Sequence, residues 1–371
     1  MPVPLDEYPL HQVPLSMQYA ATSDRNCYDR CYVNAQDRTG RLFVVTGLGV
    51  YPNLGVTDAY LTIMRDGHQS TLRLSDALGP DRMNQAVGPY RIEVLEPLRQ
   101  LRLICEPGAH GIGADITWTG SFPVLDEPLH TVRSGGRVIV DGARFAQVGT
   151  VGGIVHLDGA DLALDPAVAV GTRDRSWGIR PVGGPEPAGR GTSEPMEGFG
   201  FWWVYAPLRF EEFAIVLIAQ EDGAGTRTTA EATRVWPESS GRVPEQLGWA
   251  DFAIRYQPGS RMPAGATVTI SKRGAPLVIE IDTLGHVLLN AGPGYPGDPD
   301  WSHGQWLGRG FAGRVDVDLG DPALAGQRAV GVVDHVCRAT CQGQTGFGLF
   351  EHATFGAHLP SGFADWDSVA P

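Results

Sequence analysis

Eleven residues in the middle of the chain, GTRDRSWGIRP (171–181), gather three arginines, an aspartate and a tryptophan in a sequence that is otherwise sparsely charged. A carboxylic acid in a partly apolar pocket keeps its proton above its usual pKa and can donate it to an alkene or an alcohol. Aromatic rings stabilise the carbocation that forms. Asp174 is therefore a candidate proton donor and Trp177 a candidate wall, with Arg173 and Arg180 as organisers of the carboxylate.

The same arginines also support a structural interpretation. A close guanidinium lowers the pKa of a carboxylate, which works against proton donation. Arginine–carboxylate pairs are well suited to clamping two domains together. Alternation along a strand would place Arg173 and Arg175 on the face opposite to Asp174, which softens the conflict. The sequence leaves both interpretations open, a catalytic acid or an interdomain clamp.

Two later segments contain acids and histidines, GLFEHATFG (348–356) and VVDHVCRATC (332–341). Adjacent residues on a strand point in opposite directions, so only one of Glu351 and His352 can face a barrel interior. An inward Glu351 would have a raised pKa and would suit a general acid. An outward Glu351 would be an ordinary surface carboxylate. Glu351 and His335 are therefore secondary catalytic candidates.

Aromatic residues supply candidates for contact with a ligand. The glycine-rich segment DPDWSHGQWLGRGF contributes His303 and Trp306. Both could form the rim of a ligand site, or Trp306 could instead pack in a core. The segment FGFWWVY contributes Trp202 and Tyr205. Core packing explains part of this aromatic content, and a cavity for an apolar ligand would explain the rest.

The elements that must position these residues are strands. Hydrophobic residues alternate with period two between turn dipeptides such as Asp-Gly, and no stretch of ten or more residues has a helical stripe. The pattern predicts an all-β protein of two tandem antiparallel β-barrel domains, 1–165 and 166–371. The motif at 171–180 would lie at their junction. The proline- and glycine-rich stretch 181–198 is predicted to be a loop or lid.

Composition excludes several classes of partner. The 371 residues have a formal net charge of −13 and an isoelectric point near 5.2, which argues against nucleic acids and anionic membrane surfaces. The longest strongly apolar run, FAIVLIA, is too short to span a bilayer, and the first residues do not form a secretory signal. We expect a cytoplasmic protein with an apolar small-molecule ligand and no stable membrane insertion. Its oligomeric state is left open.

The sequence also lacks the motifs of common cofactor sites. It contains no P-loop, no dinucleotide fingerprint, no His-x-His or His-Glu-x-x-His spacing and no nucleophile elbow. Four of the five cysteines form two C-x3-C pairs, 27–31 and 337–341. If the two pairs met in space they could hold zinc, but buried free cysteines in the core are the favoured interpretation. We expect no metal and no cofactor.

Three stretches together are similar to a known group: DRNCYDRCYVNAQDRTGRLFVVTGLGVYPNLGVTDAY, VGPYRIEVLEPLRQLRL and G-x-RD-x-SWG-x-R. They resemble an uncharacterised bacterial group related to carotenoid 1,2-hydratase (hydroxyneurosporene synthase). The resemblance implies two tandem lipocalin-like β-barrels and chemistry on isoprenoid or polyene substrates. In the hydratases the motif is D-H-x-W, and its aspartate is thought to protonate the alkene. Asp174 and Trp177 match, whereas Arg175 replaces the histidine.

The expected activity combines this resemblance with the residues above. It is a cofactor-independent lyase or isomerase that begins carbocation chemistry on a terpenoid or other apolar substrate with an acid. Hydration or dehydration comes first, and cyclisation or double-bond isomerisation next. The alternative is a non-catalytic carrier of an apolar ligand, in which the motif at 171–180 is only the clamp. Neither the substrate nor the direction of reaction is determined, nor what the arginine at position 175 does to the chemistry.

Overall fold

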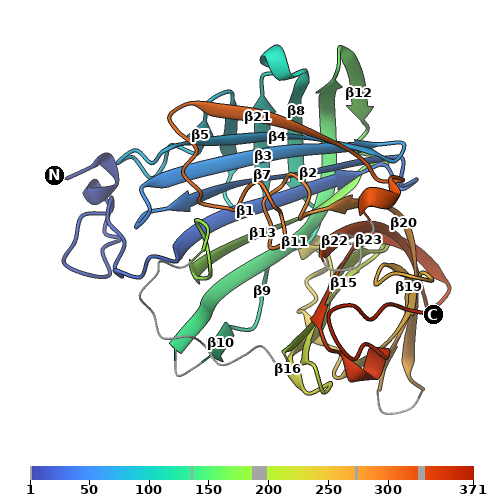
Figure 1. Cartoon of the computed structure of the whole chain (residues 1–371). Coiled ribbons are helices and arrows are strands. Elements are labelled where there is room, and N and C mark those ends of the chain that lie inside the picture. Colours follow the sequence, from blue (N-terminus) through green and yellow to red (C-terminus); the bar gives the residue numbers. More distant parts are fainter. Residues whose placement is uncertain (1, 135–136, 186–198, 272–274, 325–330) are drawn as a thin grey trace.

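The computed structural model describes residues 2–134, 137–185, 199–271, 275–324 and 331–371. The described chain is nearly all strand, and its only helices are short 3-10 turns. The strands form two curled antiparallel sheets (Figure 1). This confirms the predicted all-β class with two tandem lipocalin-like half-barrels.

The first sheet has the order β21-β4-β3-β2-β1-β13-β11-β8-β7-β6-β5, and β9, β10 and β12 also pair with β11. Its strands are β1 (Cys27–Gln36), β2 (Leu42–Tyr51), β3 (Val56–Arg65), β4 (His68–Ala77), β5 (Ala86–Val87), β6 (Tyr90–Glu96), β7 (Gln100–Cys105), β8 (Ile112–Gly120), β9 (Leu125–Asp126), β10 (His130–Ser134), β11 (Arg137–Leu157), β12 (Ala160–Leu164), β13 (Val170–Ile179) and β21 (Phe311–Asp318).

The second sheet has the order β17-β16-β15-β14-β23-β22-β20-β19-β18. Its strands are β14 (Gly200–Arg209), β15 (Ala214–Asp222), β16 (Arg227–Val235), β17 (Glu245–Gln246), β18 (Ala250–Tyr256), β19 (Pro263–Ile270), β20 (Leu277–Leu288), β22 (Val332–Cys341) and β23 (Gln344–Gly356). The 3-10 turns are η1 (Pro4–Glu7), η2 (Gly108–His110), η3 (Glu238–Ser240), η4 (Pro322–Leu324) and η5 (Leu359–Ser361).

Sequence order and sheet membership differ at two places. The strand at 170–179, expected to open the second domain, pairs with β1 and β11 in the middle of the first sheet. Strand β21 crosses back from the second half of the chain and pairs with β4 at the edge of the first sheet, where Figure 1 shows it in orange against blue strands. The predicted junction motif is thus an inner strand of the first sheet.

One predicted turn is wrong. Asp-Gly dipeptides are predicted to end strands, but the one at 141–142 lies inside the 21-residue strand β11. Gly142 and Gly178 are register partners between β11 and β13. An ideal Cβ on Gly178 would lie 2.2 Å from the carbonyl oxygen of Asp141, so the two backbones approach too closely for a side chain. Gly142 therefore lies where two strands pack closely and not in a turn.

Strand alternation divides the apolar side chains among three main clusters. One cluster fills the first half-barrel around Trp118, and another fills the second around Phe350. The third lies between the two sheets, where β13 contacts β23 and β11 contacts β14. Its members include Tyr32, Trp203 and Tyr205. Each central strand therefore presents one face to a half-barrel interior and the other to this contact between the sheets.

Two expectations about cysteines and membranes can be compared with this arrangement. Cys31 packs in the first core, and Cys337 and Cys341 pack in the second, so the two C-x3-C pairs do not meet. Cys27, Cys31, Cys105 and Cys337 are free thiols. The described ranges include no helix with the length and apolar character that crossing a bilayer takes.

Candidate active site between the two sheets

Asp174 lies on the face of β13 that is turned toward the second sheet. Its register partners are Tyr32 on β1 and Ala146 on β11, both members of the cluster between the sheets. The carboxylate is deep in the protein but retains partial solvent exposure. Within the described residues it accepts no hydrogen bond from a side chain or a backbone amide.

Burial raises the pKa of Asp174, and three guanidinium groups act against that rise: Arg144, Arg30 and Arg180, in order of effect. The net direction remains upward. The effect of burial on this pKa is therefore larger than the effect of the surrounding positive charge. The arginines therefore act on this acid through their charge and do not bind it directly.

A pair of acidic residues on the second sheet faces Asp174. Asp334 on β22 and Glu351 on β23 are register partners, and both have raised pKa values, caused chiefly by burial. The Tyr32 hydroxyl donates a 2.5 Å hydrogen bond to Asp334, and the Trp203 indole donates a 2.5 Å hydrogen bond to Glu351. The charge of Glu351 raises the pKa of Asp334 further, so the two carboxyls favour sharing a proton.

Arg144 on β11 lies beside these acids. Its guanidinium pairs with Glu127, and it lies over the rings of Trp203 and Tyr205 at 5.6 and 4.9 Å from their centroids. Burial raises the pKa of Glu127 to about 7 in spite of the arginine. The buried hydroxyl of Tyr205 has no hydrogen-bond partner among the described residues. An aromatic wall therefore borders the acids from the side of β14.

His303 belongs to a neighbouring polar group. Arg30 donates a 2.9 Å hydrogen bond to its Nε2, and Asp58 accepts a 2.6 Å hydrogen bond from the amide of Gly304. Burial is the main reason that the pKa of His303 is well below its usual value, so the ring is neutral. Arg30 links this group to Asp174 electrostatically. In contrast, Trp306 from the same predicted rim is half exposed and lies outside the group.

Trp177 and Arg173 do not join Asp174. Both lie on the other face of β13, because odd and even positions of a strand point in opposite directions. Arg173 donates two hydrogen bonds to Gln147 and lies over the Trp118 ring of the first core. Trp177 is 43% exposed and contacts Phe145. The predicted pairing of Asp174 with a Trp177 wall is therefore wrong in geometry, as is the role of Arg173 as organiser of that carboxylate.

The remaining predicted residues divide between the two faces of the second sheet. Tyr205 and Glu351 face the contact between the sheets, as described above. His335 is buried beside Phe350, to whose carbonyl oxygen its Nδ1 lies at 3.2 Å, and its pKa is well below the usual value because of burial. Trp202 packs inside the second half-barrel. His335 and Trp202 are thus separated from the acids by the sheet itself.

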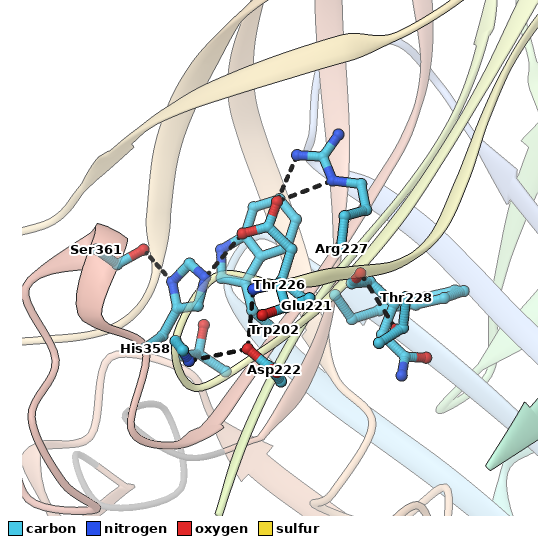
Figure 2. Close-up of polar contacts among 12 residues, drawn as sticks. Trp202, Glu221, Asp222, Thr226, Arg227, Thr228, His358 and Ser361 are labelled. Carbon is cyan, nitrogen blue, oxygen red and sulfur yellow. Dashed lines mark hydrogen bonds and ion pairs between the residues drawn. The ribbon is translucent and has the colours of Figure 1, made fainter.

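Trp202 is instead part of a polar chain at one end of the second half-barrel, shown in Figure 2. Arg227 pairs with Glu221, the second carboxylate oxygen of Glu221 lies 3.1 Å from His358 Nε2, and Nδ1 of His358 lies 2.8 Å from the Ser361 hydroxyl (Figure 2). Trp202 stacks on the imidazole with 5.3 Å between ring centroids. The order carboxylate, imidazole and hydroxyl is that of a nucleophilic triad.

The surroundings of this chain favour a structural role. The amide of Ser361 donates to the carbonyl of His358, and the amide of Gly362 donates to Leu359, so these amides are not available to stabilise an oxyanion. The amide of Leu359 donates to Gly223 at the β15 turn. The chain fastens the C-terminal segment to the β15–β16 hairpin.

The site also contains residues that the sequence argument missed. Tyr32, Arg144, Asp334, Trp203 and Glu127 are all within the acidic region, yet none was a candidate. Asp334 was adjacent to a candidate, and alternation would have selected it over His335 had the face of β22 that meets the first sheet been known. Tyr32, Arg144 and Trp203 come from strands, and Glu127 directly follows β9; only the sheet order reveals the neighbours of these residues. No local signal distinguishes them.

Comparison with solved structures shows the same fold in proteins of low sequence identity. Kievitone hydratase from Nectria haematococca is 15% identical with a TM-score of 0.50, over 91% of this chain and 90% of that chain. An AttH candidate from Nitrosomonas europaea is 14% identical with a TM-score of 0.51, over 95% and 98%. These similarities establish the fold alone. They do not show the specific relation to carotenoid 1,2-hydratase.

Sequence comparison adds a family. Among curated proteins, none matches the chain significantly. A family model does match, and it extends over residues 3–364, nearly the whole length. The chain therefore belongs to the family described as a family of unknown function, DUF8625.

Proposed function

We propose that the protein is an acid-catalysed lyase or isomerase that protonates an apolar, unsaturated substrate between the two sheets. Hydration or dehydration of a terpenoid-like substrate is the leading reaction, followed by cyclisation or double-bond isomerisation. The observation that carries the proposal is the group of three carboxyls with raised pKa values, Asp174, Asp334 and Glu351, beside aromatic rings. A raised pKa keeps an acid protonated near neutral pH.

Asp174 is the proposed proton donor because its carboxyl is partly exposed and accepts no hydrogen bond within the described residues. Its proton would form a new C–H bond with the π electrons of an alkene and leave a cation on the adjacent carbon. Water would add to that cation and return a proton to the carboxylate. Dehydration is the same sequence in reverse.

The neighbouring groups suit a developing cation. The rings of Trp203 and Tyr205 offer π faces. The charge of Arg144 would oppose a cation, but its ion pair with Glu127 offsets that charge. Glu351, also partly exposed, is the proposed second acid, and its pairing with Asp334 supplies a shared proton. A hydratase on the same fold, in Nectria haematococca, is compatible with this assignment.

The alternative, a carrier of an apolar ligand, is favoured by one observation. The hydrogen bond from Tyr32 to Asp334 joins β1 of the first sheet to β22 of the second. Such a contact holds the sheets together and needs no catalysis. A carrier would keep its ligand when Asp174 loses its charge, and it would show no turnover.

The decisive experiment is Asp174→Asn, assayed for turnover of a panel of linear and cyclic terpenoid alkenes and alcohols and for thermal unfolding. We expect turnover to fall by about 100-fold or more with binding retained, because positioned proton transfer contributes rate factors of that size. Turnover by the parent should fall as pH rises through the raised pKa of Asp174, because only the protonated acid donates.

Asp29→Asn is the matched control, since Asp29 lies on β1 and pairs with Arg175 on the other face of the sheet. It should leave turnover unchanged. Full activity of Asp174→Asn would remove Asp174 as the acid and shift the role to Glu351, tested by Glu351→Gln. Ligand binding with no turnover by the parent would support the carrier.

A further inference from the structure

A cleft of about 270 Å³ lies between the two sheets, apart from the acidic site. On one side is the turn that joins β1 to β2, and on the other are the β14–β15 turn and the start of β23. The residues that line it are Arg38, Val170, Arg209, Phe210, Glu211, Thr345 and Phe347. None of them belongs to the proposed acid–base machinery.

Two arginines face this cleft without a carboxylate partner. Among the described residues, neither Arg38 nor Arg209 forms an ion pair, and the buried Nε of each has no hydrogen-bond acceptor. Arg38 lies over the Phe347 ring, 5.3 Å from its centroid. Glu211 lines the same cleft but is exposed and pairs with neither guanidinium. In contrast, the guanidinium of Arg144 is paired with Glu127.

Both arginine side chains are partly withdrawn from water. Burial lowers the pKa of both guanidinium groups, and the charge of Arg38 lowers that of Arg209 further. Arg38 also has a backbone φ of 65°, in the left-handed region that residues with a side chain rarely adopt. Buried donors without acceptors and uncompensated like charges cost stability. Costs of this kind are often found where a ligand supplies the missing partner.

We propose that this cleft binds the oxyanion of a small amphiphilic ligand, a carboxylate or phosphate attached to an apolar group. The planar guanidinium has donors spaced to match both groups, and two of them would share one anion. Val170, Phe210 and Phe347 provide apolar contact for the rest of the ligand. The inference does not rest on the proposed function, because it uses a different set of residues.

The test is calorimetric titration of the full-length protein at low ionic strength with hexanoate, hexyl phosphate, inorganic phosphate and 1-hexanol. Hexanoate or hexyl phosphate should bind at least 10-fold more tightly than the neutral alcohol, and the binding should weaken as salt is added. Whichever of the two anions binds more tightly identifies the head group. Equal affinity for 1-hexanol, or no binding of either anion, would overturn the proposal.

Arg38→Gln and Arg209→Gln should each weaken anion binding at least 10-fold, and each should unfold at the same or a higher temperature than the parent, because an uncompensated charge is removed. Arg41→Gln is the matched control: Arg41 is in the same turn but is exposed and paired with Asp66. It should bind the anion like the parent. Unchanged affinity in both cleft variants would assign the anion to another site and refute the inference.

Discussion

Burial is the largest cause of the raised pKa of every acid that lies between the two sheets, and charge partners only modify it. Glu127 shows the balance at one residue, since it pairs with Arg144 and still has a pKa of about 7. The cost of removing a carboxylate from water exceeds the attraction of one arginine. The same balance keeps the pKa of Asp174 raised in spite of three nearby guanidinium groups.

Asp58 gives a residue-scale prediction about stability. Burial raises its pKa from 3.8 to about 6, although Arg30 opposes the rise. The folded state therefore holds this proton more tightly than the unfolded chain. The contribution of Asp58 to the free energy of unfolding is fully present below pH 3.8 and is lost as pH rises through 6. The shift corresponds to about 3 kcal/mol.

Asp58→Asn carries a neutral amide at every pH, so this part of the pH dependence should vanish. The measurement is the free energy of unfolding from urea titrations between pH 4 and 7, compared with the parent. Asp115→Asn is the contrasting variant: the ion pair with Arg102 lowers the pKa of Asp115, so the contribution of Asp115 to stability is nearly constant between pH 4 and 7 and is lost below that range. Parallel pH profiles for the parent and Asp58→Asn would contradict the assignment.

At the scale of elements, the position of β13 depends on close contact between backbones. An ideal Cβ on Gly171 would lie 2.2 Å from the carbonyl oxygen of Asn34 and 2.8 Å from Val151 Cγ2. The first contact is with backbone, which cannot move aside without shifting β1 or β13. A glycine here lets the strand that carries Asp174 pack in the centre of the sheet.

Gly171→Ala should therefore lower the free energy of unfolding by about 1–3 kcal/mol, the usual cost of overpacking. Gly79→Ala is the control, because no atom lies within 4 Å of a Cβ built there. It should change stability by less than about 0.5 kcal/mol. Urea midpoints at one pH measure both. Equal midpoints for the two variants would mean that β13 accommodates a side chain without strain.

At the scale of the whole molecule, the second half of the chain completes the first sheet. Strand β21 pairs along the length of β4, and Gln69 on β4 exchanges hydrogen bonds with Leu288 and donates one to the carbonyl of Ala291. The amide of Gly304 donates to Asp58 on β3. The two halves are therefore joined by paired backbone and buried polar contacts, in addition to side-chain packing between the sheets.

We expect a single cooperative unfolding transition for this reason. Loss of β21 and the 289–304 segment would expose an edge strand and leave buried polar groups of the first sheet without partners. Urea denaturation followed by far-ultraviolet circular dichroism and by tryptophan fluorescence should give coincident curves. Two separated transitions would show that each sheet is stable by itself.

The sequence by itself determined the features that depend on near neighbours. The period-two alternation predicted strands, and it placed Arg173 and Glu351 correctly on the faces opposite to Asp174 and His352. The all-β class follows from the same local pattern and is confirmed. Alternation shows which side chains of one strand share a face. It does not show which other part of the protein that face packs against.

Only the tertiary structure decided those partners. Tyr32 and Asp334 are 302 positions apart and share a hydrogen bond. Arg144 reaches Asp174 because β11 and β13 are adjacent, an order set by the sheet and not by nearness in sequence. A raised pKa requires burial among residues from distant strands, and that burial exists only once the two sheets have closed on each other.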